Sequence, residues 1–362
     1  MKERREGKKR FTGRRSIRTS LVIAAGIIMA AAIIAGSCLA PSIAGAQKED
    51  AYREKELATA GDNHLLYAYE DGVPVVVAER WLKISDDETW QLEGPAFDRK
   101  GNLFVVEIIN GQVLKVTPDK KVTTIVQKPG QAMYAGCAIH KDGRLFLADL
   151  MSGVVAMNPD GSGLTTIMPG GFIDDLTFDK EGNLYVTELA GNTIDRTAHV
   201  FRVSASPDYK KTDIVLKGLA GANGIVFAPD YSCLYVSEYT GNTLLRVQLN
   251  PDGLTPALVW GVANMYRYNG KASADSLQID AAGNIYQALY DQGRVLILNP
   301  EGVPIEQVFV PERNQGMHLK TTHVMLKPGT NEAYLTASGK GGAWIFKFRA
   351  PAGAPPNLYS HQ

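Results

Sequence analysis

Three carboxylic acids and one amide recur at a fixed position of a repeated pattern in this chain. Each copy contains a short apolar strand, an Asp-x-x-Gly-Asn turn or a variant of it, and a second apolar strand. The residue five positions before each Asp, or its equivalent, is Glu93, Ala135, Asp174, Asn223, Asp275 or Thr322. Carboxylate and amide oxygens without His or Cys are hard ligands, which suit Ca²⁺ or Mg²⁺ better than zinc.

The repeated pattern occurs six times and gives each candidate ligand its place in a fold. Each copy predicts a strand, a tight turn and a strand, and a second Gly/Asn turn and a third strand usually follow. No long helical pattern interrupts this succession, and an open sandwich would not give six equal repeats. The sequence therefore predicts an all-β fold, a six-bladed β-propeller. The copies lie at residues 96–107, 138–149, 177–188, 226–236, 278–286 and 325–335.

The ends of the propeller domain are predicted to meet. Val75 to Ile84 precede the first copy and have the pattern of an N-terminal strand that closes the last blade. In a closed ring, the candidate ligands would begin the innermost strands and point at the axis. Three carboxylates that converge there would repel one another, so either their pKa values rise or a cation lies among them. We favour Ca²⁺, which tolerates irregular geometry and accepts water as a ligand; the alternative is a water-filled polar channel.

The first 46 residues differ from the rest of the chain. Nine Lys or Arg occur between positions 2 and 18, an apolar run follows from Leu21 to Ala35, and small residues end at Ala46. This layout is typical of a secretory signal peptide, so we expect cleavage after Ala46 and a periplasmic or extracellular protein. The alternative is an uncleaved membrane anchor with the domain outside. The expected organisation is a leader at 1–46, a lead-in segment at 47–74, the propeller at 75–350 and a C-terminal tail at 351–362.

The remaining domain is acidic and carries two cysteines. Of the 38 basic and 38 acidic residues, nine and two lie in the leader, which leaves a net charge of about −7. This argues against nucleic acid as a partner, because that affinity rests on clustered Lys and Arg. Cys137 and Cys233 are expected to be buried thiols in different blades rather than a disulfide or a zinc site.

The tryptophans and the familiar enzyme motifs offer no other site. Trp81, Trp90, Trp260 and Trp344 are expected to pack between blades. The sequence contains no G-x-S-x-G nucleophile motif, no phosphate-binding loop and no dinucleotide fingerprint.

Several short motifs resemble the senescence marker protein/gluconolactonase/luciferin-regenerating enzyme family over about residues 80 to 350. Further matches resemble the drug-responsive lactonase branch of that family. They include Trp81-Leu82-x-Ile84-Ser85, residues 140–146, Gly293-Arg294-Val295-Leu296, Thr322-His323 and residues 328–331. The motifs that carry the family resemblance are Leu92-Glu93-Gly94, Ile173-Asp174-Asp175, Ala222-Asn223-Gly224 and Asp275-Ser276.

The resemblance implies an activity and a set of residues for it. It implies a Ca²⁺-dependent hydrolase that opens lactones, with an acid–base role for Asp275. It also implies that one axial Ca²⁺ is bound by Glu93, Asp174, Asn223, Asp275 and Ser276. The drug-responsive branch has a longer loop with a second Ca²⁺ site where this chain passes directly through Met151-Ser152-Gly153. Because that loop is missing, we expect one Ca²⁺. We also expect a small lactone or ester as substrate, and a monomer.

Further residues could contact the substrate, and other activities stay open. His323, Thr322 and Asp175 are candidates for substrate contact, although His323 could equally pack between strands. The acids that end the second strands are interpreted as turn caps. The same Ca²⁺ propeller could instead serve as a phosphotriesterase, as an isomerase or as a non-catalytic calcium-binding propeller, because a fold alone does not set the chemistry.

Overall fold

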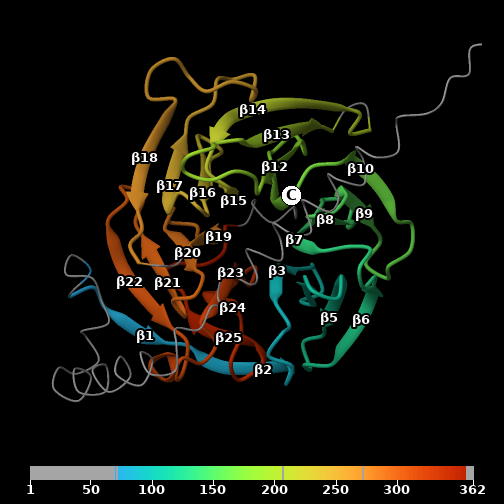
Figure 1. Ribbon diagram of the computed structural model, residues 1–362, viewed down its shortest axis with the longest axis vertical. Coiled ribbons are helices and arrows are strands. Elements are labelled where there is room, and N and C mark those ends of the chain that lie inside the picture. The colour runs from blue at the N-terminus through green and yellow to red at the C-terminus, as the bar shows by residue number, and fades with distance from the viewer. Residues whose placement is uncertain (1–69, 71, 206–207, 271–272, 356–362) are drawn as a thin grey trace, which may run out of the picture. The chain divides into compact units, whose positions relative to one another are not determined.

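Six sheets of mainly antiparallel strands are arranged as blades around a common axis (Figure 1). The structure, a computed structural model, describes residues 70, 72–205, 208–270 and 273–355, and these belong to one compact unit. The first strand of each blade contacts the first strand of the next, and the sixth contacts the first, so the ring is closed. The predicted six-bladed β-propeller is therefore confirmed.

The blades follow one another in chain order, with the innermost strand first. The first three blades are β3 (Leu92–Phe97), β4 (Leu103–Glu107), β5 (Gln112–Val116) and β6 (Val122–Gln127); β7 (Tyr134–Ile139), β8 (Leu145–Asp149), β9 (Gly153–Met157) and β10 (Thr165–Pro169); and β11 (Ile173–Phe178), β12 (Leu184–Glu188), β13 (Ala198–Ser204) and β14 (Lys211–Leu219).

The fourth blade repeats this arrangement, whereas the fifth and sixth blades receive an outer strand from the N-terminal end of the domain. The last three blades are β15 (Ala222–Phe227), β16 (Leu234–Glu238), β17 (Thr243–Val247) and β18 (Val262–Arg267); β19 (Ala274–Ile279), β20 (Ile285–Leu289), β21 (Arg294–Leu298) and β22 (Pro304–Phe309); and β23 (Lys320–Leu326), β24 (Glu332–Ser338), β25 (Ala343–Arg349) and β2 (Glu79–Ser85). A short 3₁₀ helix, η2 (Arg313–Gln315), precedes the sixth blade.

The ring is closed by the N-terminal end of the propeller. β2 pairs with β25 and completes the sixth blade, as predicted from the pattern of Val75 to Ile84. That segment is nevertheless two strands, because β1 (Val75–Val77) pairs in parallel with β22 and adds a fifth strand to the fifth blade. Glu70, just before β1, is fully buried and forms a salt bridge of 2.6 Å with Arg294. The start of the domain is thus bound to two blades.

The repeated Asp-x-x-Gly-Asn motif forms the turn between the first two strands of a blade. In the first blade, Asp98 accepts hydrogen bonds from the Asn102 backbone N–H at 2.8 Å and from its side-chain amide at 2.6 Å. Gly101 has a φ of 78°, a left-handed conformation that favours glycine. The same Asp–Asn pair recurs at Asp179 with Asn183 and at Asp280 with Asn284. This turn sets the register of the innermost strands.

Aromatic side chains pack between neighbouring blades and form much of the core. Phe146 meets Phe178 at a centroid distance of 5.1 Å, and Tyr185 meets Phe227 at 5.0 Å, both in edge-to-face contacts that join two blades. Such pairs stabilise beyond the area they bury, by about 0.5–1.5 kcal/mol each. Phe97 and Tyr334 close the ring in the same way at 5.1 Å.

The tryptophan prediction is right for three residues and wrong for one. Trp81 and Trp90 pack against the buried cluster of the first and sixth blades, and Trp344 packs against that of the fifth and sixth blades. Trp260, in contrast, is 80% exposed. It lies in the connection between β17 and β18, which the repeat pattern does not cover, so its register could not be read from the other blades.

The cysteine prediction is confirmed, whereas the leader cannot be assessed. Cys137 and Cys233 are buried in different blades, and neither forms a disulfide. The leader at 1–46 and most of the lead-in segment lie outside the described residues. Within the described ranges, no helix is long and apolar enough to cross a bilayer.

Candidate metal centre and active site

The six candidate positions meet where the innermost strands begin. Glu93, Ala135, Asp174, Asn223 and Asp275 are each the second residue of their strand, and Thr322 is the third residue of β23. All six are at most 5% exposed. The repeat register therefore places the polar members of this set, which we call the axial ring, at one end of the propeller axis.

Every innermost strand has a β-bulge at the axial ring. The pairing with the second strand shifts register between Glu93 and Ala96, between Ala274 and Leu277, and at the equivalent place in the other four blades. A bulge leaves a residue out of the regular ladder and re-aims nearby side chains. The local distortion thus lets side chains of consecutive residues approach the axis.

Small residues next to the axial ring allow the innermost strands to come close together. A Cβ on Gly94 would lie 2.6 Å from the backbone nitrogen of Cys137, and one on Gly224 would lie 2.6 Å from that of Leu277. Either contact is shorter than real side chains make, so these positions require glycine. In the third, fifth and sixth blades the same position holds Asp175, Ser276 and His323, whose side chains add polar groups to the centre.

The three carboxyl groups of the axial ring influence one another through a buried environment. Burial raises the pKa of Glu93 to about 8. Burial, followed by the negative charges of Glu93 and Asp174, raises the pKa of Asp275 well above its usual range. Burial and the Glu93 charge do the same to the pKa of Asp174. Without a cation, burial and mutual repulsion therefore favour the protonated form of these carboxyls.

The residues present fit an oxygen-coordinated cation. Oε1 of Glu93 is buried and has no hydrogen-bond partner among the described residues, although most buried polar atoms have one. The Ser276 hydroxyl lies 3.2 Å from Oδ1 of Asn223, so two neutral oxygen donors stand beside the acids. Among the described residues, no three or more His, Cys, Asp or Glu side chains form a ready-made metal cluster. The fit to a cation therefore rests on the oxygen donors, on the unpaired Oε1 of Glu93 and on the repulsion among the three carboxyl groups.

Hydroxyl groups on the second strands fix the ligand-bearing strands, and sequence reasoning missed them. Ser237 on β16 accepts a hydrogen bond from Gly224 N–H at 2.8 Å and donates one to the Asp275 carbonyl at 2.7 Å. Thr187 on β12 donates to the Asn223 carbonyl in the same manner. Each hydroxyl precedes the acid that ends its strand, and this Thr/Ser-Glu pair is the sequence signal that could have revealed them.

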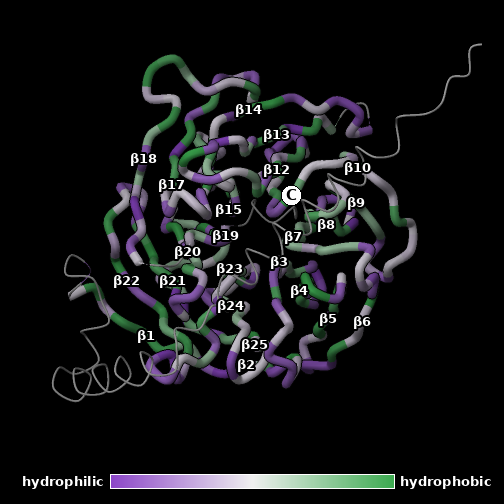
Figure 2. The backbone as a smooth tube through the Cα atoms, viewed as in Figure 1, coloured by the Kyte–Doolittle hydropathy of each residue, from purple (hydrophilic) through white to green (hydrophobic). Residues whose placement is uncertain are grey.

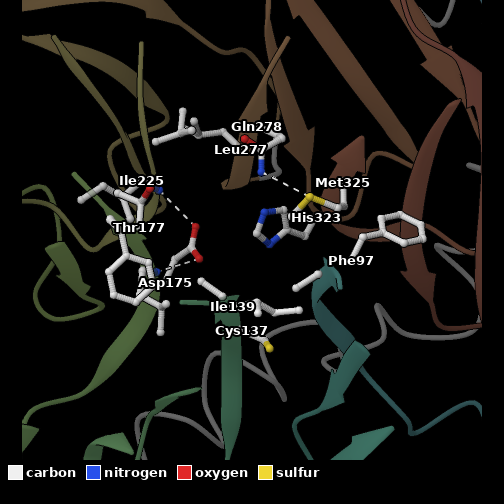
Figure 3. A pocket seen from close by; sticks show the side chains of 15 residues that line it. Phe97, Cys137, Ile139, Asp175, Thr177, Ile225, Leu277, Gln278, His323 and Met325 are labelled. Carbon is white, nitrogen blue, oxygen red and sulfur yellow. Dashed lines mark hydrogen bonds between the residues drawn. The ribbon is translucent and has the colours of Figure 1, made fainter. Parts of the chain in front are cut away.

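Asp175 and His323 face the axial cavity just beyond the axial ring (Figure 3). His323 Nδ1 lies 3.2 Å from Oε2 of Glu93, and burial lowers the pKa of the imidazole. Asp175 accepts backbone hydrogen bonds from Leu176 and Ile225, and burial raises its pKa to about 6. The cavity continues along apolar side chains to Met325.

Thr322 and the acids at the ends of the second strands are occupied by structural contacts. The Thr322 hydroxyl donates to the Leu92 carbonyl of the first blade at 2.7 Å. Glu107 accepts hydrogen bonds from the backbone of Ile109 and Asn110, and Asp149 from that of Met133 and Met151. The interpretation as turn caps is confirmed for Glu107 and Asp149, whereas Glu188 contacts the His199 side chain instead. The substrate roles of Thr322, His323 and Asp175 remain predictions.

The connection that follows β8 is short. It consists of residues 150–152, after which β9 begins at Gly153. A Cβ on Gly153 would collide with the Met168 carbonyl oxygen, which fixes this tight turn. The second blade therefore passes from β8 to β9 through a tight turn, as the sequence Met151-Ser152-Gly153 indicated.

The closed ring and its buried acids define a β-propeller with a polar site at one end of its axis. A family model described as "SMP-30/Gluconolactonase/LRE-like region" matches residues 92–338. The chain therefore belongs to the SMP-30/gluconolactonase/LRE-like family, as the sequence motifs suggested.

Named relatives and solved structures support the same placement. The chain is 38% identical to a lactonase drp35 of Staphylococcus saprophyticus over 313 residues, 83% of this chain and 94% of the relative. Its fold is similar to a calcium-binding protein, regucalcin, of Agrobacterium tumefaciens, with a TM-score of 0.64 and 18% identity over 79% of this chain and 99% of that one. A gluconolactonase of Xanthomonas campestris gives a TM-score of 0.60 and 16% identity over 73% and 88%.

The raised pKa of Glu93 predicts how stability depends on pH. A carboxyl with a pKa of about 8 in the folded state and an ordinary pKa in the unfolded state binds more protons when folded. With chelator present, the free energy of unfolding should therefore fall as the pH rises from about 5 to about 8. Added Ca²⁺ should remove this loss. Melting temperatures across this range test it, with Glu93→Gln expected to flatten the chelated curve; identical curves for the two proteins would contradict the assignment.

The Ser237 bridge is predicted to position Asp275. Ser237→Ala removes the hydroxyl between Gly224 and Asp275, which should cost about 1–3 kcal/mol of stability. It should also weaken Ca²⁺ binding, measured by titration calorimetry. Thr321→Val is the matched control, because the Thr321 hydroxyl bonds the Leu289 carbonyl and no ring residue. Equal Ca²⁺ affinities in the two variants would show that Ser237 is only structural.

Proposed function

We propose that this protein is a Ca²⁺-dependent hydrolase that opens small lactones. The observation that carries the proposal is the axial ring itself, with Glu93, Asp174 and Asp275 buried on separate blades. The relatives named as lactonases support the reaction class, and the relative named as calcium-binding supports the metal. One Ca²⁺ is proposed because the connection after β8 is short.

The metal would be held by residues that the fold already brings together. Glu93, Asp174 and Asp275 would supply charge, while Asn223 and Ser276 would supply neutral oxygens. A bound Ca²⁺ would provide the positive charge that polarises the lactone carbonyl and keeps the three carboxyls ionised.

Asp275 would act on the proton of the attacking water. Its carboxylate would accept that proton while the water oxygen bonds to the acyl carbon. The ring C–O bond would then break, and the proton would pass from Asp275 to the leaving alkoxide oxygen, giving a hydroxy acid. Ser237 and the Gln287 side-chain amide, the latter at 2.6 Å, donate hydrogen bonds to the Asp275 carbonyl. These contacts fix the backbone from which the Asp275 side chain would reach the water and the leaving oxygen.

His323 would orient the Glu93 carboxylate from the side of the cavity. Its ring lies beside Glu93, and burial lowers its pKa, which favours the neutral imidazole. A neutral imidazole next to a ligand carboxylate can orient that carboxylate by hydrogen bonding. The residue would thus position Glu93 and, since it lines the cavity, would also contact the substrate.

The activity proposal is tested by substitution of Asp275. Asp275→Asn should retain Ca²⁺, because an amide oxygen still binds the ion, but should lose about 100-fold or more of lactone hydrolysis. Glu188→Gln is the control, since Glu188 ends a second strand and contacts His199 rather than the ring. The assay uses aliphatic lactones, an aryl ester and a phosphotriester, each with and without chelator. Full lactonase activity in Asp275→Asn, or activity unaffected by chelator, would refute the mechanism.

We also propose that the protein is exported and processed after Ala46. The basic segment, the apolar run and the small residues at 44–46 support this. Protein recovered outside the cytoplasm should begin at Gln47, as determined by N-terminal sequencing and intact mass. An exported protein of full mass in the membrane fraction would instead support the uncleaved anchor.

A further inference from the structure

The fourth blade has an unusually long connection between its two outer strands. Residues 248–261 join β17 to β18, whereas the equivalent connections are residues 117–121 in the first blade and 299–303 in the fifth. The extra residues continue the hairpin, because Asn250 N–H donates to the Thr255 carbonyl at 2.8 Å and Leu249 pairs with Pro256. The connection is therefore a hydrogen-bonded extension of the β17–β18 hairpin.

Residues 258–260 lie outside the hydrogen-bonded ladder of this hairpin. Gln248 accepts a hydrogen bond from Ala257 N–H at 2.9 Å and donates one to the Gly261 carbonyl at 2.8 Å. Because the residues on both sides bond to Gln248, residues 258–260 leave the ladder together. A Cβ on Gly261 would collide with the Ala257 carbonyl oxygen, so glycine is needed to close the base. We call residues 258–260 the apolar bulge.

The apolar bulge presents only hydrophobic side chains to solvent. Leu258 is fully exposed, Val259 is 67% exposed and Trp260 is 80% exposed, and the next residue but one, Val262, is half exposed. Trp260 has a φ of 59°, a conformation that bulky residues rarely adopt and that costs energy. Figure 2 shows the connection between β17 and β18 at the rim of the propeller, with hydrophobic residues in part of it.

We propose that the apolar bulge inserts into the surface of a lipid bilayer. Adjacent exposed apolar side chains mark an interaction site. The bulge is convex and has three residues, too few for the roughly 800 Å² per partner that a stable protein interface needs. A Trp beside Leu and Val suits the boundary between headgroups and acyl chains, where tryptophan is enriched.

The charges near the bulge indicate the kind of membrane. Residues 248–261 contain one charged side chain, Asp252, and no Lys or Arg. The domain beyond the leader has a net charge of about −7 and would not be drawn to anionic lipid. The insertion should therefore be hydrophobic and insensitive to salt, with zwitterionic phosphatidylcholine as a sufficient partner. The export proposed above would bring the domain to a membrane, and the inference rests on that proposal only for its setting.

The bulge and the axial ring lie at opposite ends of the fourth blade. Thr243, at the start of β17, pairs with Glu238, which pairs with Ala222 beside the ring residue Asn223. The other end of β17, Val247, pairs with Val262 next to the bulge. A domain inserted through the bulge would keep the axial ring at its far end, accessible from water.

Trp260 fluorescence with vesicles tests the insertion directly. The full chain is mixed with phosphatidylcholine vesicles, with or without brominated acyl chains, at low and high salt. Wild type should show a blue-shifted emission component that bromine quenches, and Trp260→Phe should lose that component. A segment elsewhere in the chain could hold the protein on the vesicle, but it would not place Trp260 within reach of the bromine.

A combined variant separates membrane insertion from self-association. Leu258→Ser, Val259→Ser and Trp260→Ser together should keep the melting temperature and the lactonase activity, because these side chains make no core contact. Equal quenching in wild type and Trp260→Phe, or no quenching in either, would overturn the proposal. So would a concentration-dependent dimer in ultracentrifugation that the combined variant abolishes, since the bulge would then contact a second copy.

Discussion

The centre of this propeller must accommodate the repulsion among the buried carboxyl groups of Glu93, Asp174 and Asp275. Each acid comes from a different blade, so the acids can approach only if six innermost strands pack closely around the axis. Gly94 and Gly224 permit the approach, and the bulges aim the side chains. Ser237 and Thr187 then tie two ligand-bearing strands, those of Asp275 and Asn223, to the preceding blades. Because burial and mutual repulsion raise the pKa values of these acids, proton binding and metal binding at the ring are both linked to the stability of the fold.

The sequence predicted the fold and the axial ring because both depend on one repeated turn. The Asp98–Asn102 turn sets where an innermost strand ends, so counting five residues back reaches the same depth in every blade. The hydroxyl bridges could not be found in this way, because Ser237 acts on the next blade and only the closed ring brings it to Asp275. Trp260 was misplaced for the opposite reason: it lies in a connection that no other blade repeats.

The two ends of the propeller are thus specialised differently. One end gathers buried polar groups whose positions are fixed by backbone contacts, and the other carries the apolar bulge of the fourth blade. Strands of five or six residues separate them, so changes at the bulge need not disturb the ring. A site for small soluble molecules and a site for a surface can therefore change independently on one fold.

The pairing of β2 with β25 also constrains how the chain comes to be folded. Glu79 meets Lys347, so the sixth blade cannot form until nearly the whole domain has been synthesised. Contacts of such long sequence separation form slowly, because a large loop must close first. A growing chain would therefore stay open, without its completed ring, while it leaves the ribosome. Such an open chain can still be threaded through a narrow membrane channel, whereas a closed propeller cannot.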